Sequence, residues 1–179
     1  IVKMVEKGAD STQLTNEMIR IGRIILIVLG LIWSGFLTCG QQFITLWAGQ
    51  ANTDAYLVAV ILMTAYMFIL TESIGTQILW AMNQHKEQAI FKGVIVVLNI
   101  FLTIVLIKWQ PLIGATLGTF ISLMLGDVVV MNVIFRKKLK MNLWYYYKGL
   151  AKGILPCIAI AAIVGFVAGY FLKNGGWTY

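Results

Sequence analysis

The chain has 179 residues, of which 60% are hydrophobic and only 12% are charged. A typical soluble domain is about 25% charged, so a water-soluble fold cannot hide this much apolar surface. The net charge of +7 does not indicate a nucleic-acid partner, because the basic residues lie at the ends of apolar segments and form no contiguous patch, an arrangement that suits anionic lipid.

Five apolar segments succeed one another, each long enough to cross about 30 Å of hydrocarbon as a helix rising about 1.5 Å per residue. Helices satisfy their own backbone hydrogen bonds in lipid, whereas a barrel needs shorter segments of alternating polarity. The sequence therefore predicts an all-α integral membrane protein with five transmembrane helices, at about 21–47, 55–82, 89–107, 112–135 and 150–172.

Charge placement predicts how these helices are oriented. Twelve of the 14 Lys and Arg residues lie on one side of the predicted helices, and the other side holds only Lys108 and Lys173. Because basic residues concentrate on the cytoplasmic side, residues 1–20 are predicted to be a cytoplasmic connector and residues 173–179 an external tail. An odd number of helices with a connector at each end predicts a fragment of a longer polytopic chain.

The first connector contains a helix-start signal. Asp10 or Ser11 can cap a short amphipathic helix that leads into the first membrane helix. Gln13 follows Asp10 by three residues, a spacing that resembles a capping box.

The second predicted helix carries polar side chains in its later half. At helical spacing Glu72, Thr76 and Asn83 share one stripe, and Gln77 lies beside it. Lipid rejects such a face, so we expect it to face protein or water.

Two further polar residues lie inside predicted helices. Asn99 lies in the third helix, whose Lys92 is expected to extend toward the cytoplasmic interface. Asp127 lies within the fourth, where a charge costs at least about 2.5 kcal/mol, so it must be paired, protonated or hydrated. With Glu72 and Gln77, these residues are candidates for lining a cavity or for ion coupling. The alternative is that they pair one helix with another.

Small residues predict where helices approach each other closely. Gly114 and Gly118 are four residues apart in the fourth predicted helix, and Gly165 and Gly169 repeat that spacing in the fifth. The aromatic run 144–147 stands next to basic residues and is typical of a membrane interface.

No motif predicts catalysis, a metal site or a cofactor. His85, the only histidine, has no serine or cysteine nucleophile beside it, and Cys39 and Cys157 are too few for a metal site. There is no phosphate-binding glycine loop. The expectation is a protein that is not an enzyme.

The order of these features resembles the C-terminal region of Wzx-type flippases for O-antigen and capsule polysaccharide. These belong to the multidrug/oligosaccharidyl-lipid/polysaccharide (MOP) exporter superfamily. The resemblance rests on Gly8-Ala9-Asp10 before an Arg-containing helix start, a helix ending in Asn83-Gln84, a helix centred on Asn99, and the run 111–119. Asn99, Pro111, Gly114, Ala115 and Thr119 match, whereas Thr116 and Gly118 stand where the family often has alanine.

The resemblance implies the ninth to thirteenth helices of a transporter with two lobes and roughly fourteen helices. Such a protein resides in the bacterial inner membrane and moves an undecaprenyl-diphosphate-linked oligosaccharide by alternating access. Its expected partners are membrane lipid, that substrate, the remaining helices of the parent chain, and H⁺ or Na⁺ as a coupling ion.

Two other functions remain open. A cation-coupled multidrug exporter of the same superfamily would use membrane carboxylates such as Glu72 and Asp127. A membrane-embedded polysaccharide polymerase or glycosyltransferase is disfavoured, because the external connectors at about 48–54 and 108–111 are too short to build a catalytic site.

Overall fold

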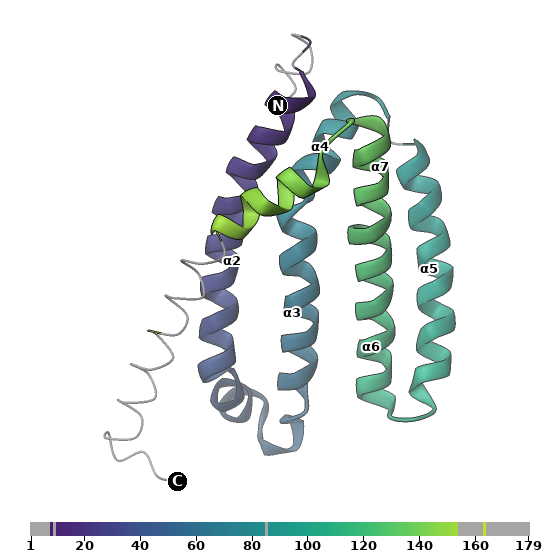
Figure 1. The fold of residues 1–179 in the computed structure, drawn as a ribbon. Coiled ribbons are helices and arrows are strands. Elements are labelled where there is room, and N and C mark those ends of the chain that lie inside the picture. The colour runs from purple at the N-terminus through teal and green to yellow at the C-terminus, as the bar shows by residue number, and fades with distance from the viewer. Residues whose placement is uncertain (1–7, 9, 85, 154–162, 164–179) are drawn as a thin grey trace.

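A computed structural model of the protein describes residues 8, 10–84, 86–153 and 163, and the regular secondary structure of these residues is helical (Figure 1). The helical character predicted for the first four apolar segments is confirmed. Most of the predicted fifth helix lies outside the described residues, as do Gly165, Gly169, the tail 173–179 and His85. Four helices are long and apolar enough to cross a membrane: Ser11–Ala48, Ala55–Ala81, Lys86–Ile107 and Pro111–Lys138.

The first of these, α2 (Ser11–Ala48), is one continuous helix of 38 residues. The predicted boundary near residue 20 is therefore wrong, since the end of the connector and the first membrane helix form one element. The predicted capping box is confirmed: the Asp10 side chain accepts from the Gln13 backbone N–H, and Gln13 Oε1 accepts from the Asp10 backbone N–H at 3.3 Å. Asp10 Oδ1 also accepts from the Ser11 backbone N–H at 2.8 Å. At about 1.5 Å per residue, α2 is about 57 Å long and exceeds the thickness of a bilayer core.

The second membrane segment, predicted over 55–82, is helical over Ala55–Ala81 but is divided at one residue. It consists of α3 (Ala55–Thr71) and α4 (Ser73–Ala81), and the helix is interrupted at Glu72, whose backbone has φ −89° and ψ −3°. Asn83 does not lie on the predicted polar stripe, because it adopts a left-handed conformation with φ 56° just after α4. Its N–H donates to the Trp80 carbonyl, and that of Gln84 donates to the Leu79 carbonyl, which closes the helix end.

The third and fourth membrane segments form a helical hairpin. They are α5 (Lys86–Ile107) and a continuous run of α6 (Pro111–Leu123), the π-helical segment η2 (Met124–Val130) and α7 (Met131–Lys138). Glycines allow the close approach: a Cβ on Gly114 would overlap the Leu106 carbonyl oxygen, and one on Gly118 would lie 2.8 Å from Thr103 Oγ1.

Replacing Gly114 with alanine is expected to lower the free energy of unfolding by about 1–3 kcal/mol, because the added methyl group meets backbone that cannot turn aside. Gly93→Ala in α5 is the matched control, since nothing lies within 4 Å of its added Cβ. That change should be neutral or stabilising, because alanine favours a helix by about 1 kcal/mol over glycine. Thermal unfolding in detergent, followed by circular dichroism, compares the two. Equal melting temperatures would contradict the close contact between α5 and α6.

The helix ends fall into two groups at opposite ends of the bundle (Figure 1). One group, which we call the basic end, contains the start of α2, the end of α4, the start of α5 and the end of α7. The other contains the connector with η1 (Gln50–Asn52) between α2 and α3, and the turn between α5 and α6. Lys108 lies in that second turn, so among the described residues the separation of charges inferred from the sequence is kept in three dimensions.

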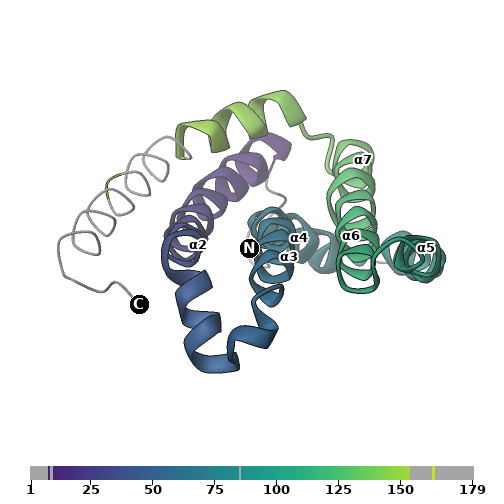
Figure 2. The same cartoon turned by 90° about the horizontal axis from the view of Figure 1, so that it is seen from below.

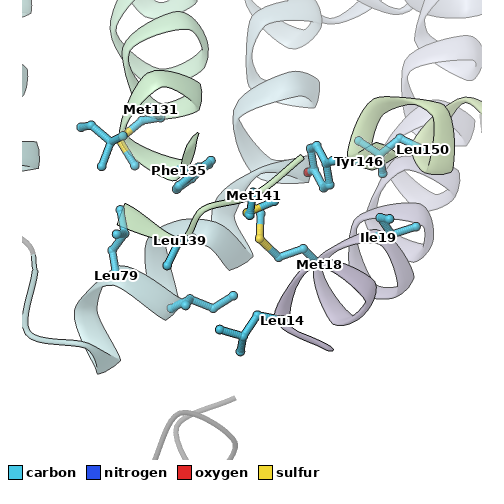
Figure 3. Close-up of a cluster of buried hydrophobic side chains, with 12 residues drawn as sticks. Leu14, Met18, Ile19, Leu79, Met131, Phe135, Leu139, Met141, Tyr146 and Leu150 are labelled. Carbon is cyan, nitrogen blue, oxygen red and sulfur yellow. The ribbon is translucent and has the colours of Figure 1, made fainter. Parts of the chain in front are cut away.

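A cluster of buried apolar side chains lies at the basic end (Figure 3). Residues 143–153 form a helix that crosses the first part of α2 (Figures 1 and 2). This helix, α2, α4 and α7 all contribute buried side chains, which join segments far apart in the sequence. The members are Leu14, Met18, Ile19, Ile78, Leu79, Met131, Ile134, Phe135, Leu139, Met141, Tyr146 and Leu150.

Candidate functional site

Glu72 lies at the break between α3 and α4, and only 3% of its surface is exposed. Two neutral side chains hold its carboxylate. The Tyr147 hydroxyl donates to Oε1 at 2.6 Å, and Asn132 Nδ2 donates to Oε1 at 2.9 Å and to Oε2 at 3.1 Å. We call these three residues the Glu72 network. Its members come from the helix break, from α7 and from the helix at 143–153.

The surroundings of Asn132 hold the network in place. Its Nδ2 also lies 2.8 Å from the Val128 carbonyl oxygen one turn earlier and 2.5 Å from the Tyr147 hydroxyl, so its two hydrogens are shared among four acceptor atoms. Its Oδ1 is buried and accepts no hydrogen bond from any described residue. Next to it, the buried Tyr146 donates its hydroxyl to the Thr71 carbonyl at 3.4 Å, which ties the crossing helix to the end of α3.

The carboxylate of Glu72 has no cationic partner among the described residues, and this determines the electrostatics of the network. Within the described part of the chain, no Lys, Arg or His forms an ion pair with Glu72. Burial, and then the neighbouring Glu72 carboxylate, raises the pKa of the Tyr147 phenol well above its usual range, so Tyr147 stays protonated and remains a donor. A buried carboxylate with only neutral donors is costly to keep charged, and this favours uptake of a proton or a monovalent cation.

The network reaches the surface at an open groove of about 690 Å³. Asn132 and Tyr147 form part of its wall, and Arg136 and Lys137 stand in the same groove. The other four described lining residues are apolar: Val128, Val129, Val133 and Leu143. The groove therefore offers a route from the protein surface to the polar atoms around Glu72.

No family model, curated protein or solved structure matches this chain. No group of three or more His, Cys, Asp or Glu residues in the described part of the chain is placed to hold a metal ion.

The other predicted site residues lie elsewhere. Asp127 Oδ1 pairs with Lys92 Nζ at 2.9 Å, so this lysine bonds across the hairpin, and its extension to the cytoplasmic interface stays a prediction. Asn99 and Asp127 line one small groove of about 250 Å³ between α5 and the α6–η2 segment. Gln77 is exposed on α4 and forms no hydrogen bond with another described side chain.

A second ion pair supports a structural role for Asp127. Lys138 Nζ lies 2.7 Å from Glu87 Oε1, and this pair also joins α5 to the following membrane segment. The two pairs lie one above the other on the same hairpin, closer to its basic end than to the turn at Pro111. Asp127 thus matches the alternative in which a membrane carboxylate pairs helix to helix, whereas Glu72 has no such partner among the described residues.

Sequence reasoning missed Asn132 and Tyr147. No sequence signal marks Asn132, and the pattern around Tyr147 predicts an interfacial belt. A helix turns by about 100° per residue, so four consecutive aromatic residues occupy its whole circumference and cannot all face the interface. That argument identifies the run 144–147 as containing at least one inward-facing residue, and the structure shows Tyr146 buried and the Tyr147 hydroxyl on Glu72.

Proposed function

We propose that this chain is part of an ion-coupled membrane transporter that moves a lipid-linked oligosaccharide by alternating access. The observation that carries the proposal is the buried Glu72 carboxylate, which lies at a break in a membrane helix and is held only by neutral donors. Ionisable groups inside membrane segments mark ion and substrate pathways, and transporters place such sites at interrupted helices.

Protonation of Glu72 would change contacts between three elements. The charged carboxylate accepts from Tyr147 and from Asn132, but a protonated carboxyl must place its own O–H on an acceptor. The Tyr147 hydroxyl can turn to accept that hydrogen, and the buried Asn132 Oδ1 is an acceptor without a described partner. Binding of a proton therefore alters how the α3–α4 break is joined to α7 and to the crossing helix, which is the kind of local switch that alternating access requires.

The nature of the cargo rests on the resemblance. The run from Pro111 to Thr119 and the helix centred on Asn99 support an undecaprenyl-diphosphate-linked O-antigen or capsule unit, and the bacterial inner membrane as its location. The concentration of basic residues at one end of the bundle supports a cytoplasmic basic end. The remaining helices of the parent chain would complete the cavity for the sugar head group.

A cation-coupled multidrug exporter is the second candidate, because a buried carboxylate without a fixed cation suits it equally well. The two candidates differ in cargo and share the coupling step. An enzymatic polymerase has less support, since the described connectors at the end opposite the basic end are short.

Reconstituting the full-length protein in proteoliposomes tests the coupling. Under an imposed pH gradient, Glu72→Gln is expected to slow translocation of lipid-linked oligosaccharide by about tenfold, within the usual range of coupling free energies. Glu87→Gln is the control, because this glutamate lies in the first turn of α5 and pairs with Lys138.

Two outcomes would contradict the proposal. If Glu72→Gln responds to the pH gradient as the unchanged protein does, the Glu72 network does not couple transport to protons. If the unchanged protein exports a fluorescent cationic drug and leaves the lipid-linked sugar in place, the cargo assignment is wrong and the exporter function is favoured.

A further inference from the structure

A second groove lies at the basic end, between the start of α2 and the helix at 143–153. Its volume is about 670 Å³, and four cationic side chains line it: Arg20, Arg23, Lys148 and Lys152. No acidic residue is among the described residues that line it. We call this hollow the basic groove. It is separate from the groove at the Glu72 network, with which it shares no lining residue.

Helix geometry brings these four charges together. Arg20 and Arg23 are three residues apart on α2, and Lys148 and Lys152 are four apart on the crossing helix, so each pair lies on one helix face. Gly149 and Gly153 lie on the side of the crossing helix that contacts α2. A Cβ on Gly149 would lie 2.8 Å from Ile19 Cδ1, and one on Gly153 would lie 2.9 Å from Arg23 Cγ.

Arg23 is held in position by this close crossing. Its Nε donates to the Gly149 carbonyl oxygen at 2.8 Å, a contact that a side chain on the crossing helix would obstruct. Its terminal nitrogens bond to no other described residue. On the rim, the Tyr145 hydroxyl donates to Asn16 Oδ1 at 3.0 Å, which joins the same two helices at a second point.

The charges of the basic groove are not neutralised within the described part of the chain. Arg23, Lys148 and Lys152 have no carboxylate within ion-pair distance there, and Arg20 contacts Glu17 only at 3.7 Å while 76% of its side chain is exposed. Four like charges around one hollow repel one another, so an anion bound among them is stabilised.

An exposed apolar strip begins at the edge of the basic groove. Ile24 lines the groove, and Val28 and Ile32 come after it at intervals of four residues, so the three side chains lie on one face of α2. All three are exposed. The strip leads away from the charged groove into the part of α2 that is apolar enough to cross a membrane.

We propose that the basic groove binds the phosphate of an anionic membrane phospholipid, whose acyl chains lie along Ile24, Val28 and Ile32. Basic hollows between membrane helices on the cytoplasmic side are suited to anionic headgroups. The adjoining apolar strip distinguishes a lipid from free phosphate, because a soluble anion makes no use of it. The site does not depend on the proposed transport function, and lipid bound there would hold the start of α2 against the crossing helix.

The test measures lipid binding to the full-length protein in detergent by native mass spectrometry, without any transport assay. The probes are phosphatidylglycerol and phosphatidylcholine. The double variant Lys148→Gln with Lys152→Gln is expected to weaken phosphatidylglycerol binding by about 30-fold, at about 1 kcal/mol for each charge near the surface. Phosphatidylcholine binding should not change. Both lysines are exposed, so the variant should keep its melting temperature.

The matched control removes two charges from the same end of the molecule, by Lys86→Gln with Lys137→Gln, and should change phosphatidylglycerol binding by less than about threefold. Equal weakening in both double variants would show diffuse surface attraction and overturn the proposal. Displacement of phosphatidylglycerol by an equal concentration of soluble pyrophosphate would also overturn it, because the groove would then bind free phosphate.

Discussion

Phe135→Ala is expected to lower the free energy of unfolding by about 3–5 kcal/mol, the largest effect of any single change predicted for this protein. The Phe135 ring is 0% exposed and lies in the apolar cluster at the basic end. It packs directly on Gly75 of α4, where an added Cβ would overlap the ring. Because α2, α4, α7 and the crossing helix meet in this cluster, the cavity left by the ring weakens contacts among all four.

Phe101→Ala is the matched control for this prediction. Phe101 is the same residue type on α5, but it is 63% exposed. Its loss should cost less than about 1 kcal/mol, since surface substitutions create no buried cavity. Unfolding by sodium dodecyl sulfate from mild detergent micelles, followed by tryptophan fluorescence, measures both variants. Equal losses of stability would contradict the placement of the core at the basic end.

Asn132→Leu is expected to lower the free energy of unfolding by about 2–4 kcal/mol, because it removes two of the three hydrogen bonds to a buried carboxylate. Glu72 would keep only the bond from Tyr147. Adding Glu72→Leu to this variant should recover most of the loss, to within about 1 kcal/mol, since no buried charge is then left unsatisfied.

The same detergent unfolding measurement checks this pair, with Asn99→Leu as the control. Asn99 is half-buried, and its only described side-chain hydrogen bond is a long one of 3.5 Å with Thr103. Its replacement should change stability by less than about 1 kcal/mol. If Asn132→Leu and the double variant are equally unstable, Glu72 and Asn132 are not coupled and the Glu72 network does not hold the helix break.

The acidic residues of the membrane segments differ in the groups that hold them. Asp127 is neutralised by Lys92 within one helical hairpin, so its charge strengthens the packing of α5 on the segment after it. Glu72 joins the helix break to α7 and to the crossing helix through neutral groups. A carboxylate that binds a proton at such a three-way junction can change how the helices are joined, whereas the Asp127–Lys92 pair joins only the two arms of one hairpin.

Much of the architecture could be predicted from composition and periodicity alone. Lipid offers the backbone no hydrogen-bond partners, so long apolar runs must form helices, which satisfy their own backbone groups. Four of the predicted segments are helical in the structure. Local hydrogen bonding also set the start of α2, where Asp10 and Gln13 form the predicted cap. These features depend on residues close together in the chain, which is why the sequence pattern alone reveals them.

Only the tertiary structure decided which polar residues meet. Glu72 is a candidate on sequence grounds, but its partners Asn132 and Tyr147 are 60 and 75 residues away, and no local pattern connects positions at that distance. The helix break at Glu72 and the crossing of α2 by the helix at 143–153 likewise depend on long-range packing. Hydrophobic periodicity predicts which residues are buried away from water. Which residues they contact is decided by how the helices pack against one another.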